Sequence, residues 1–513
     1  MHHTFQSPNR LLLTALLLGV CADLLFFGRS IGISAALFVV LGLMALAWLS
    51  HVEERPPNRA SVWLGAAASG FALLLALRET SLLSMLNACT TAGLLLMLAA
   101  TFRGHPLGTL SWAQAMVHSL IVLVEAAFYP APLLMHGARS VAEHSGHVRR
   151  LAPVGRGLLL AAPTLMIFTG LLAAADSVFA GYVSAVLTLH LPFDLPATLN
   201  HVLFTGLAGW LCAGGLLAAL RNGPPGPVRT ELPAEGDTQR LRPVARRLLG
   251  FAEALTVLVS VACLFGAFML VQAAYLFGGR DTLAQTGMTY STYARRGFFE
   301  LLAVACLALT MLLTLAALTR RDSRGQRYAF NIACATIVAL VIGMLVSAFQ
   351  RMLLYQAAYG YTHLRIYTLS FMIWLALVLL LFLVALFRAA PRLFSWGTFA
   401  TALLYLVALN GVNPDALIAR GNLARYHQSG TLDARYLATL SSDATPELVA
   451  ALPALNGDAQ TIIASALDAQ RQRLERIETT SGWPAWHFGR MRALHALQAV
   501  EQRSFTCCSV TPP

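Results

Sequence analysis

The sequence contains no lysine and few charged residues of any kind. All its basic residues are arginine, and charged side chains make up 12% of the 513 residues, against 57% hydrophobic ones. The mean hydropathy of +0.65 lies outside the range of soluble globular proteins. Arginine forms bidentate contacts with phosphate and carboxylate groups that lysine cannot form. The lack of lysine, together with abundant Ala, Gly and Leu, is nevertheless typical of GC-rich codon usage and predicts no function.

The sequence also lacks motifs for nucleotide binding, metalloprotease chemistry and serine-nucleophile chemistry. Most of its eight cysteines stand singly inside apolar stretches, where a lone cysteine behaves as a small hydrophobic side chain. Cys507 and Cys508 are adjacent near the end, with no metal-ligand spacing around them. We therefore expect no cofactor and no metal, and the sequence favours a non-enzymatic protein without deciding the question.

Long apolar stretches are what the sequence has in abundance. About twelve of them, each of roughly 17–25 residues, are long enough to cross the hydrocarbon of a membrane as helices. Helices are the expected form because lipid offers no partners to bare backbone groups. The candidate spans are 11–27, 31–50, 61–77, 80–101, 110–129, 157–175, 198–220, 250–274, 298–319, 328–349, 366–388 and 393–410. We predict an all-α polytopic transmembrane bundle of 11–12 spans over 1–410, followed by a small extramembrane helical domain over 411–513.

The net charge of +12 comes from arginines in the short turns between these stretches. Acidic and basic residues balance in 411–513, so the surplus lies in the membrane part and nucleic-acid binding is not expected. If 110–129 does not cross, most arginine-bearing turns fall on one side, which the positive-inside rule makes cytoplasmic. We predict eleven crossings, with the amino terminus cytoplasmic and the tail extracytoplasmic. Twelve crossings, with both termini on one side, are the alternative.

The segment 110–129 also carries a polar stripe. Ser111, Gln114, His118 and Glu125 recur at helical spacing on an otherwise apolar helix. Such a stripe lines a hydrated cavity, forms hydrogen bonds inside a bundle, or belongs to an interfacial or re-entrant helix. Glu125 is the deepest carboxylate among the predicted spans and is therefore a candidate for an intramembrane function.

Two segments on the predicted outer side, 287–300 and 350–365, combine arginine with aromatic residues and are interpreted as loops. Tyrosine at the headgroup level is an ordinary membrane anchor, whereas arginine on the outer side runs against the positive-inside bias. Arginines that converge there would bind phosphate, a carboxylate or an anionic headgroup. The candidate ligand-binding residues are Arg295, Arg296, Glu300, Arg351, Tyr355 and Arg365. Interfacial anchoring is the competing interpretation.

The pattern changes after the last apolar stretch. Asn413 is placed to cap a helix whose first residue is Pro414 and which ends near Gly430. Shorter helices are predicted over 432–440, 444–452, 458–478 and 484–502. We expect these segments to form a compact helical domain that leans on the membrane through Trp483 and Trp486.

Several stretches together carry a family resemblance. They are Asp23–Gly28, Ala175–Phe179, Val271–Gly279, Tyr290–Glu300, Arg351–Thr362, Asp415–Arg420, Leu432–Leu437, Asp443–Pro446 and Trp486–Arg492. The chain resembles a bacterial membrane family known only as domain of unknown function number 4173, with number 4153 as a relative. The resemblance implies a multi-pass protein of the bacterial inner membrane and brings no established activity or catalytic residues. Gly421 departs from it, because a bulkier residue is expected before Asn422.

Two functions are favoured by these features; a third, a membrane transferase acting on lipid-linked substrates, would need a paired acid and cation at the outer face, and nothing in the sequence places Glu300 or Asp176 in such a pair. The first is a transporter or lipid-handling protein that receives an anionic lipid or small anion at its extracytoplasmic face, and the sequence leans toward it. The alternative is a non-catalytic membrane sensor whose tail, residues 411–513, binds another envelope protein. Membrane lipids are expected partners in both cases.

Overall fold

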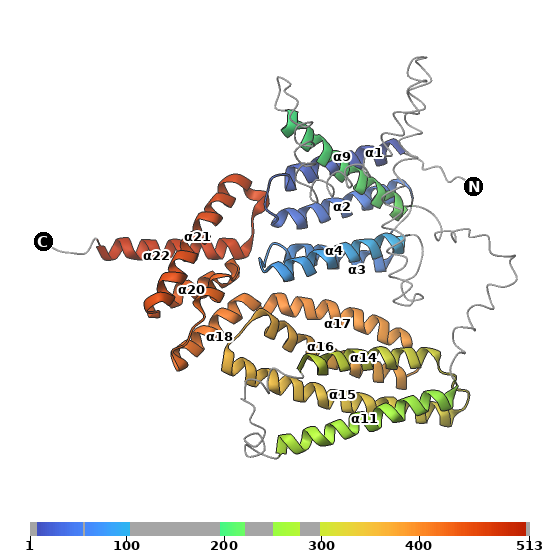
Figure 1. Cartoon of the computed structure of the whole chain (residues 1–513). Coiled ribbons are helices and arrows are strands. Elements are labelled where there is room, and N and C mark those ends of the chain that lie inside the picture. Colours follow the sequence, from blue (N-terminus) through green and yellow to red (C-terminus); the bar gives the residue numbers. More distant parts are fainter. Residues whose placement is uncertain (1–7, 55–56, 103–194, 221–249, 278–297, 509–513) are drawn as a thin grey trace, which may run out of the picture. The chain divides into compact units, whose positions relative to one another are not determined.

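The computed structural model describes residues 8–54, 57–102, 195–220, 250–277 and 298–508. Within these ranges the regular secondary structure is helical throughout (Figure 1). Nine of the described helices are long and apolar enough to cross a membrane. The predicted all-α polytopic bundle is therefore confirmed. The candidate spans 110–129 and 157–175, and with them Gln114, His118 and Glu125, lie outside the described residues.

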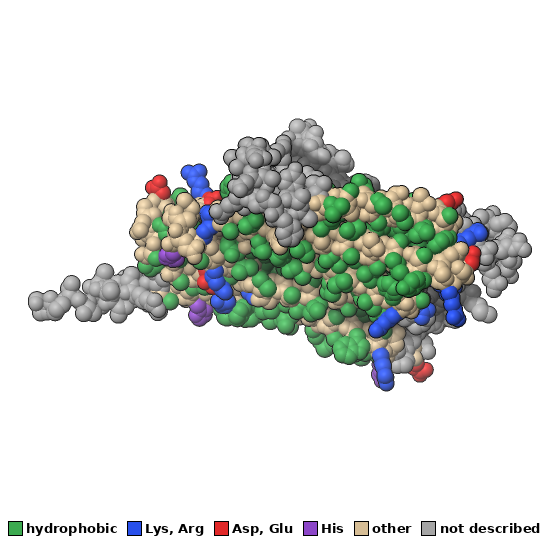
Figure 2. Space-filling model, turned by 90° about the horizontal axis from the view of Figure 1, so that it is seen from below, with side chains coloured by type: hydrophobic (Ala, Val, Ile, Leu, Met, Phe, Trp, Pro, Cys, Tyr) green, Lys and Arg blue, Asp and Glu red, His purple; other side chains and the backbone are tan. Residues whose placement is uncertain are grey.

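The long apolar helices carry hydrophobic side chains on the outside as well as in their contacts. They are α1 (Pro8–Phe26), α2 (Ile33–Val52), α4 (Ser81–Phe102), α9 (Leu195–Leu220), α11 (Phe251–Phe277), α14 (Phe298–Leu318), α15 (Arg324–Tyr359), α16 (His363–Phe387) and α17 (Pro391–Val412); α3 (Arg59–Leu74) is a shorter apolar helix. In Figure 2 green hydrophobic side chains cover the long sides of the visible helices, and charged side chains gather toward their ends. Leu270, for example, is 75% exposed, as expected for a surface that faces lipid.

The described chain forms two compact units. Unit 1 comprises residues 1–226 and 468–513, and unit 2 comprises residues 227–467, so the division falls within α21 (Gly457–Ser481). Each unit thus contains membrane helices together with part of the predicted tail. The predicted domain boundary between 1–410 and 411–513 stays a prediction.

In unit 1, α1 and α9 cross closely because each has a glycine at the contact. A Cβ atom at Gly19 would lie 2.5 Å from the carbonyl oxygen of Thr205, and one at Gly209 would lie 3.2 Å from that of Ala15. Small residues allow such close approach of helices in lipid. Toward the carboxyl end of α1, the ring of Phe27 packs on His201, with centroids 3.9 Å apart. The two helices therefore run antiparallel, since later residues of α1 meet earlier residues of α9.

In unit 2, α15 runs through the centre of the core and contacts α11, α14 and α16. Its side chains Phe330, Ile337 and Val341 are fully buried. The helix begins at a capping box formed by Ser323 and Gln326 and continues for 36 residues. At about 1.5 Å per residue it is about 54 Å long, well beyond the roughly 30 Å of membrane hydrocarbon.

The interpretation of 350–365 as a loop was wrong for most of that segment. It is helical up to Tyr359 and again from His363, with only residues 360–362 between the two helices. Nothing between Gln350 and Tyr359 breaks a helix, and the chain turns at Gly360, whose φ of +82° is accessible to glycine at little cost.

The predicted cap and ends of the first tail helix are confirmed. α18 (Pro414–Ser429) is capped by Asn413, whose side chain accepts a hydrogen bond from Ala416 N, and it ends at Gly430 in the left-handed conformation. The remaining tail helices are α19 (Ala434–Ala438), α20 (Thr445–Ala451), α21 and α22 (Phe488–Cys508), with short 3₁₀ turns η3 (Ser442–Ala444), η4 (Leu452–Ala454) and η5 (Trp483–Ala485).

Candidate functional site

Three of the predicted ligand-binding residues lie near the α15–α16 turn of unit 2. Arg351 and Tyr355 are one helical turn apart on α15, and Arg365 is in the first turn of α16. The guanidinium carbon of Arg365 lies 4.2 Å from the centre of the Tyr355 ring, within the range of a cation–π interaction. Arg351 is largely buried. The structure therefore brings Tyr355 and Arg365 into contact, with Arg351 on the same helix as the tyrosine.

The other predicted ligand-binding residues cannot be placed around this contact. Arg295 and Arg296 lie outside the described residues, and Glu300 belongs to α14 without a described side chain. The convergence of these residues with Arg351 and Arg365 stays a prediction.

The α15–α16 turn is held by side chains of α18. Asn422 accepts a hydrogen bond from Tyr361 N at 2.9 Å and donates one to Tyr361 O at 2.8 Å. Arg425 donates to the carbonyl oxygen of Ala358 at 2.7 Å, which satisfies a backbone group that the end of α15 leaves without a helical partner. A Cβ atom at Gly421 would lie 2.5 Å from the Tyr361 ring. The glycine that departs from the family pattern therefore makes room for an aromatic side chain of the turn.

A buried acid–base pair joins the start of α16 to the tail. His363 Nε2 lies 2.5 Å from Asp415 Oδ1, and the Asp415 side chain is 1% exposed. Ser441 donates to the other carboxylate oxygen through both its hydroxyl group and its backbone N–H. Burial alone would raise the pKa of Asp415, but the hydrogen bonds from His363 and Ser441 outweigh burial and hold the pKa below its ordinary value. Asp415 is therefore a buried carboxylate that stays ionised.

Tyr436 completes this cluster. Its hydroxyl oxygen accepts a hydrogen bond from His363 N at 2.9 Å, and the hydroxyl group also lies 3.2 Å from His363 Nδ1. A histidine that carries its proton on Nε2 satisfies both contacts of the ring, because Nε2–H donates to Asp415 and Nδ1 accepts from Tyr436. The ring is thereby fixed between a membrane helix and two helices of the tail.

The same face of α16 carries further polar side chains into the span. His363, Tyr367, Ser370 and Trp374 follow one another at helical spacing. Ser370 and the Tyr405 hydroxyl on α17 are 3.1 Å apart, and the rings of Trp374 and Tyr405 stack at 5.9 Å. The Tyr367 hydroxyl and Trp374 Nε1 are buried and make no hydrogen bond with a described residue.

Sequence analysis missed this stripe and the acid–base pair beneath it. The spacing of four, three and four residues between polar or aromatic side chains was a visible signal for the stripe. No sequence signal links His363 to Asp415, because the pair depends on how α18 packs against α16.

The arrangement does not form a nucleophilic relay. In such a relay the histidine stands between the serine and the carboxylate and withdraws the serine proton. Here Ser441 and His363 both bind the same carboxylate, so Asp415 stands between them. The cluster can fix charged and hydrogen-bonding groups at the tail-side end of α16, but His363 is not placed to withdraw the proton of Ser441.

Comparison with known families assigns the chain. Residues 12–451 match the family described as Domain of unknown function (DUF4153). The chain belongs to the DUF4153 family. The sequence resemblance pointed to family number 4173, with DUF4153 as its relative. The match is to DUF4153, and the relation to family number 4173 stays a prediction. No curated protein and no solved structure matches the chain significantly.

The DUF4153 region contains the whole cluster around Asp415. His363, Asp415, Tyr436 and Ser441 all lie within 12–451, as do Arg351, Tyr355 and Arg365. Both α21 and α22 lie entirely beyond the matched residues. The candidate site is therefore part of the DUF4153 region itself.

Proposed function

We propose that this DUF4153 protein is a multi-pass protein of the bacterial cytoplasmic membrane that handles an anionic lipid or small anion at its extracytoplasmic face. Its amino terminus would be cytoplasmic and its tail extracytoplasmic. The observation that carries the proposal is the stacking of Arg365 on Tyr355 at the tail-side end of unit 2.

Contacts of the carboxyl-terminal segment with unit 1 support this orientation. Ile33 N, at the start of α2, donates to Trp486 O at 2.9 Å, and Phe488 N donates to Ala76 O in the α3–α4 turn at 2.7 Å. The α1–α2 and α3–α4 turns are thus at the end of unit 1 where the tail lies. Because α1 precedes the first of these turns, the amino terminus belongs to the opposite end.

The direction of α9 supports an odd number of crossings. α4 begins at the tail-side α3–α4 turn and therefore ends on the opposite side, at Phe102. α9 is antiparallel to α1, so it begins on the tail side. These directions favour an odd number of crossings between α4 and α9, for which the apolar stretch 157–175 is the candidate from the sequence. One crossing there gives the eleven that the distribution of arginine favours.

The stacked arginine suits an anionic ligand. A guanidinium held over an aromatic ring is oriented by the ring, while its N–H groups remain at the edge of the planar group. One of them donates to Gly360 O, which fixes the guanidinium against the α15–α16 turn. The rest of the fork is suited to a phosphate or carboxylate. Arg351, one helical turn away from Tyr355, adds positive charge at the same end of α15.

The full-length protein, extracted in native-lipid discs, tests this function. Bound lipids and small anions would be quantified by mass spectrometry for the wild type, the Arg351→Gln/Arg365→Gln double variant and an Arg388→Gln control. Arg388 caps the opposite end of α16 and is exposed. We expect one anionic species to be enriched in the wild type and the control, and reduced about tenfold in the double variant, as for the loss of one charge-assisted contact.

Equal amounts of every anionic species in all three samples would contradict the proposal, provided that the double variant elutes as a folded protein. The working proposal would then be the alternative, a non-catalytic sensor or partner protein that acts through residues 411–513.

A further inference from the structure

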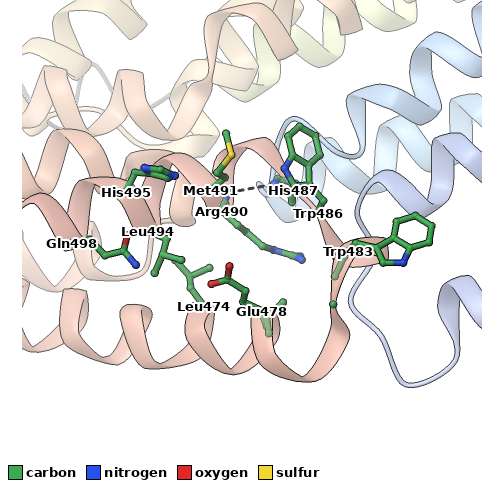
Figure 3. Close-up of a pocket in the computed structure, with 13 residues that line it drawn as sticks. Leu474, Glu478, Trp483, Trp486, His487, Arg490, Met491, Leu494, His495 and Gln498 are labelled. Atoms are coloured by element: carbon green, nitrogen blue, oxygen red, sulfur yellow. Dashed lines mark hydrogen bonds between the residues drawn. The ribbon is translucent and has the colours of Figure 1, made fainter.

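The second half of α21 and the first half of α22 form a groove in unit 1 with a volume of about 460 Å³ (Figure 3). Such a volume is typical of small-ligand sites. Leu474, Ile477, Met491 and Leu494 give the groove an apolar lining. Trp483 and Trp486 lie at the end where the two helices are joined, and they are 67% and 41% exposed.

This end of the groove is attached to the ends of membrane helices. Trp486 O accepts a hydrogen bond from the first residue of α2, Ile33, and Ser30 N donates to Ser481 Oγ at 3.3 Å. A Cβ atom at Gly32 would overlap the Trp486 carbonyl group. Exposed tryptophans beside the ends of apolar spans are typical of the membrane–water interface. The groove therefore opens at the level of lipid headgroups.

A guanidinium is fixed in the groove by a buried carboxylate. Arg490 Nε donates to Glu79 Oε1 at 2.9 Å, and the Arg490 and Glu79 side chains are 16% and 10% exposed. Arg473 binds the same oxygen at 2.6 Å. Arg490 Nη1 is buried and has no acceptor among the described residues. Glu79 thus takes one edge of the Arg490 guanidinium and leaves hydrogen-bonding capacity on the rest of it.

A carboxylate faces this guanidinium without pairing with it. In Figure 3 the side chains of Glu478 and Arg490 both point into the space between the two helices. Glu478 is exposed, and its carboxylate makes no hydrogen bond or ion pair with the described part of the chain. The groove therefore presents one positive and one negative group above an apolar lining.

We propose that this groove binds the headgroup of a zwitterionic aminophospholipid. The phosphate would lie at Arg490, the ammonium group at Glu478, and the glycerol and upper acyl carbons along the apolar lining. An ammonium group is attracted by a carboxylate that has no cation of its own. An anionic lipid such as phosphatidylglycerol fits less well, because its headgroup carries no positive charge that could pair with Glu478. This site is separate from the anion site proposed in unit 2.

The test reconstitutes the full-length protein in discs of phosphatidylethanolamine and phosphatidylglycerol in equal amounts. Lipids retained after gentle extraction are then counted by native mass spectrometry. The variants are Glu478→Gln and the control Glu475→Gln, which changes a carboxylate of the same helix that pairs with Arg471. Because Glu478 is exposed, Glu478→Gln should fold as the wild type does.

We expect the wild type and the control to retain phosphatidylethanolamine over phosphatidylglycerol, and Glu478→Gln to reduce this preference about tenfold. Soluble glycerophosphoethanolamine should compete only weakly, because it lacks the acyl carbons. Competition as strong as that of the lipid would overturn the lipid assignment. Equal retention of both lipids by the wild type, or an unchanged preference in Glu478→Gln, would overturn the site.

Discussion

His363 and Asp415 form a buried pair, 2.5 Å apart, that connects the first turn of a membrane helix to the first turn of the tail. Asp415 also receives two hydrogen bonds from Ser441, so one carboxylate binds three donors from two other segments. The tail of unit 2 is thus fixed to α16 by a charge that water cannot reach.

Replacing Asp415 should therefore weaken the attachment of the tail. Asp415→Asn removes the negative charge and places an amide N–H₂ group next to the hydrogen-bond donors of His363 and Ser441. We expect this change to lower the free energy of unfolding by about 3 kcal/mol. The thermal midpoint of the purified protein measures the loss. Asp433→Asn, at the exposed cap of α19, is the matched control and should change the midpoint little. A similar midpoint for both variants would mean that the pair contributes no net stability.

The pH dependence of Asp415 has a definite sign. Its pKa is lower in the folded protein than in the unfolded chain, so the stabilisation is present at neutral pH and is lost as the pH falls through the folded pKa. The wild type should therefore lose this contribution as the pH is lowered, whereas Asp415→Asn lacks it at every pH.

His487 should make unit 1 sensitive to milder acid. Burial and the neighbouring Arg490 lower the pKa of His487 from 6.5 to about 4. The unfolded chain then binds a proton between pH 6.5 and 4 while the folded protein does not, so stability falls as the pH is lowered through this window. The thermal midpoint, measured from pH 7.5 to 4, should fall more in the wild type than in His487→Gln. Parallel curves for the two proteins would contradict this assignment.

The Gly19–Gly209 crossing should not tolerate a larger side chain. In Gly19→Val the new Cβ would meet the Thr205 carbonyl group, and separating the helices should cost about 3 kcal/mol. Gly42→Val on α2 is the control, because a Cβ there meets no atom within 4 Å. The yield and thermal midpoint of both variants, purified in detergent, provide the comparison. Equal values would show that α1 and α9 do not require this close approach.

The proposed orientation is testable with single cysteines in a background without the native ones. Thr431→Cys lies in the tail, Asp322→Cys in the α14–α15 turn and Asn9→Cys at the start of α1, and all three positions are exposed. A membrane-impermeant maleimide should label Thr431→Cys in intact spheroplasts, and the other two only after lysis. Labelling of both Asn9→Cys and Thr431→Cys in intact spheroplasts would instead favour twelve crossings.

Local signals in the sequence predicted most of the fold. Apolar length identified the described membrane helices, and Asn413, Pro414 and Gly430 placed both ends of α18. The error at 350–359 has a physical reason, because polar and aromatic residues suggested a loop although no residue before Gly360 breaks the helix. Hydropathy indicates where a segment leaves the hydrocarbon of the membrane, but it does not indicate where the helix ends, because a helix can continue into water with the same backbone conformation.

The contacts of the candidate site were less predictable. Arg351, Tyr355 and Arg365 were recognisable as unusual residues, but the stacking of Arg365 on Tyr355 depends on the sharp turn at Gly360. The partners of Asp415 and Glu79 come from segments that no local pattern connects. Such pairs follow from packing between distant parts of the chain, which composition and periodicity do not encode.

The distance along the chain between Glu79 and its partners has a consequence for biosynthesis. Arg473 and Arg490 follow Glu79 by 394 and 411 residues. At roughly 5–20 residues per second, a ribosome needs roughly 20–80 s to make the intervening chain. Throughout that interval the α3–α4 turn is already synthesised but lacks the two cations that neutralise its carboxylate. The α3–α4 turn therefore acquires these two ion pairs only when almost the last residues of the protein have been made.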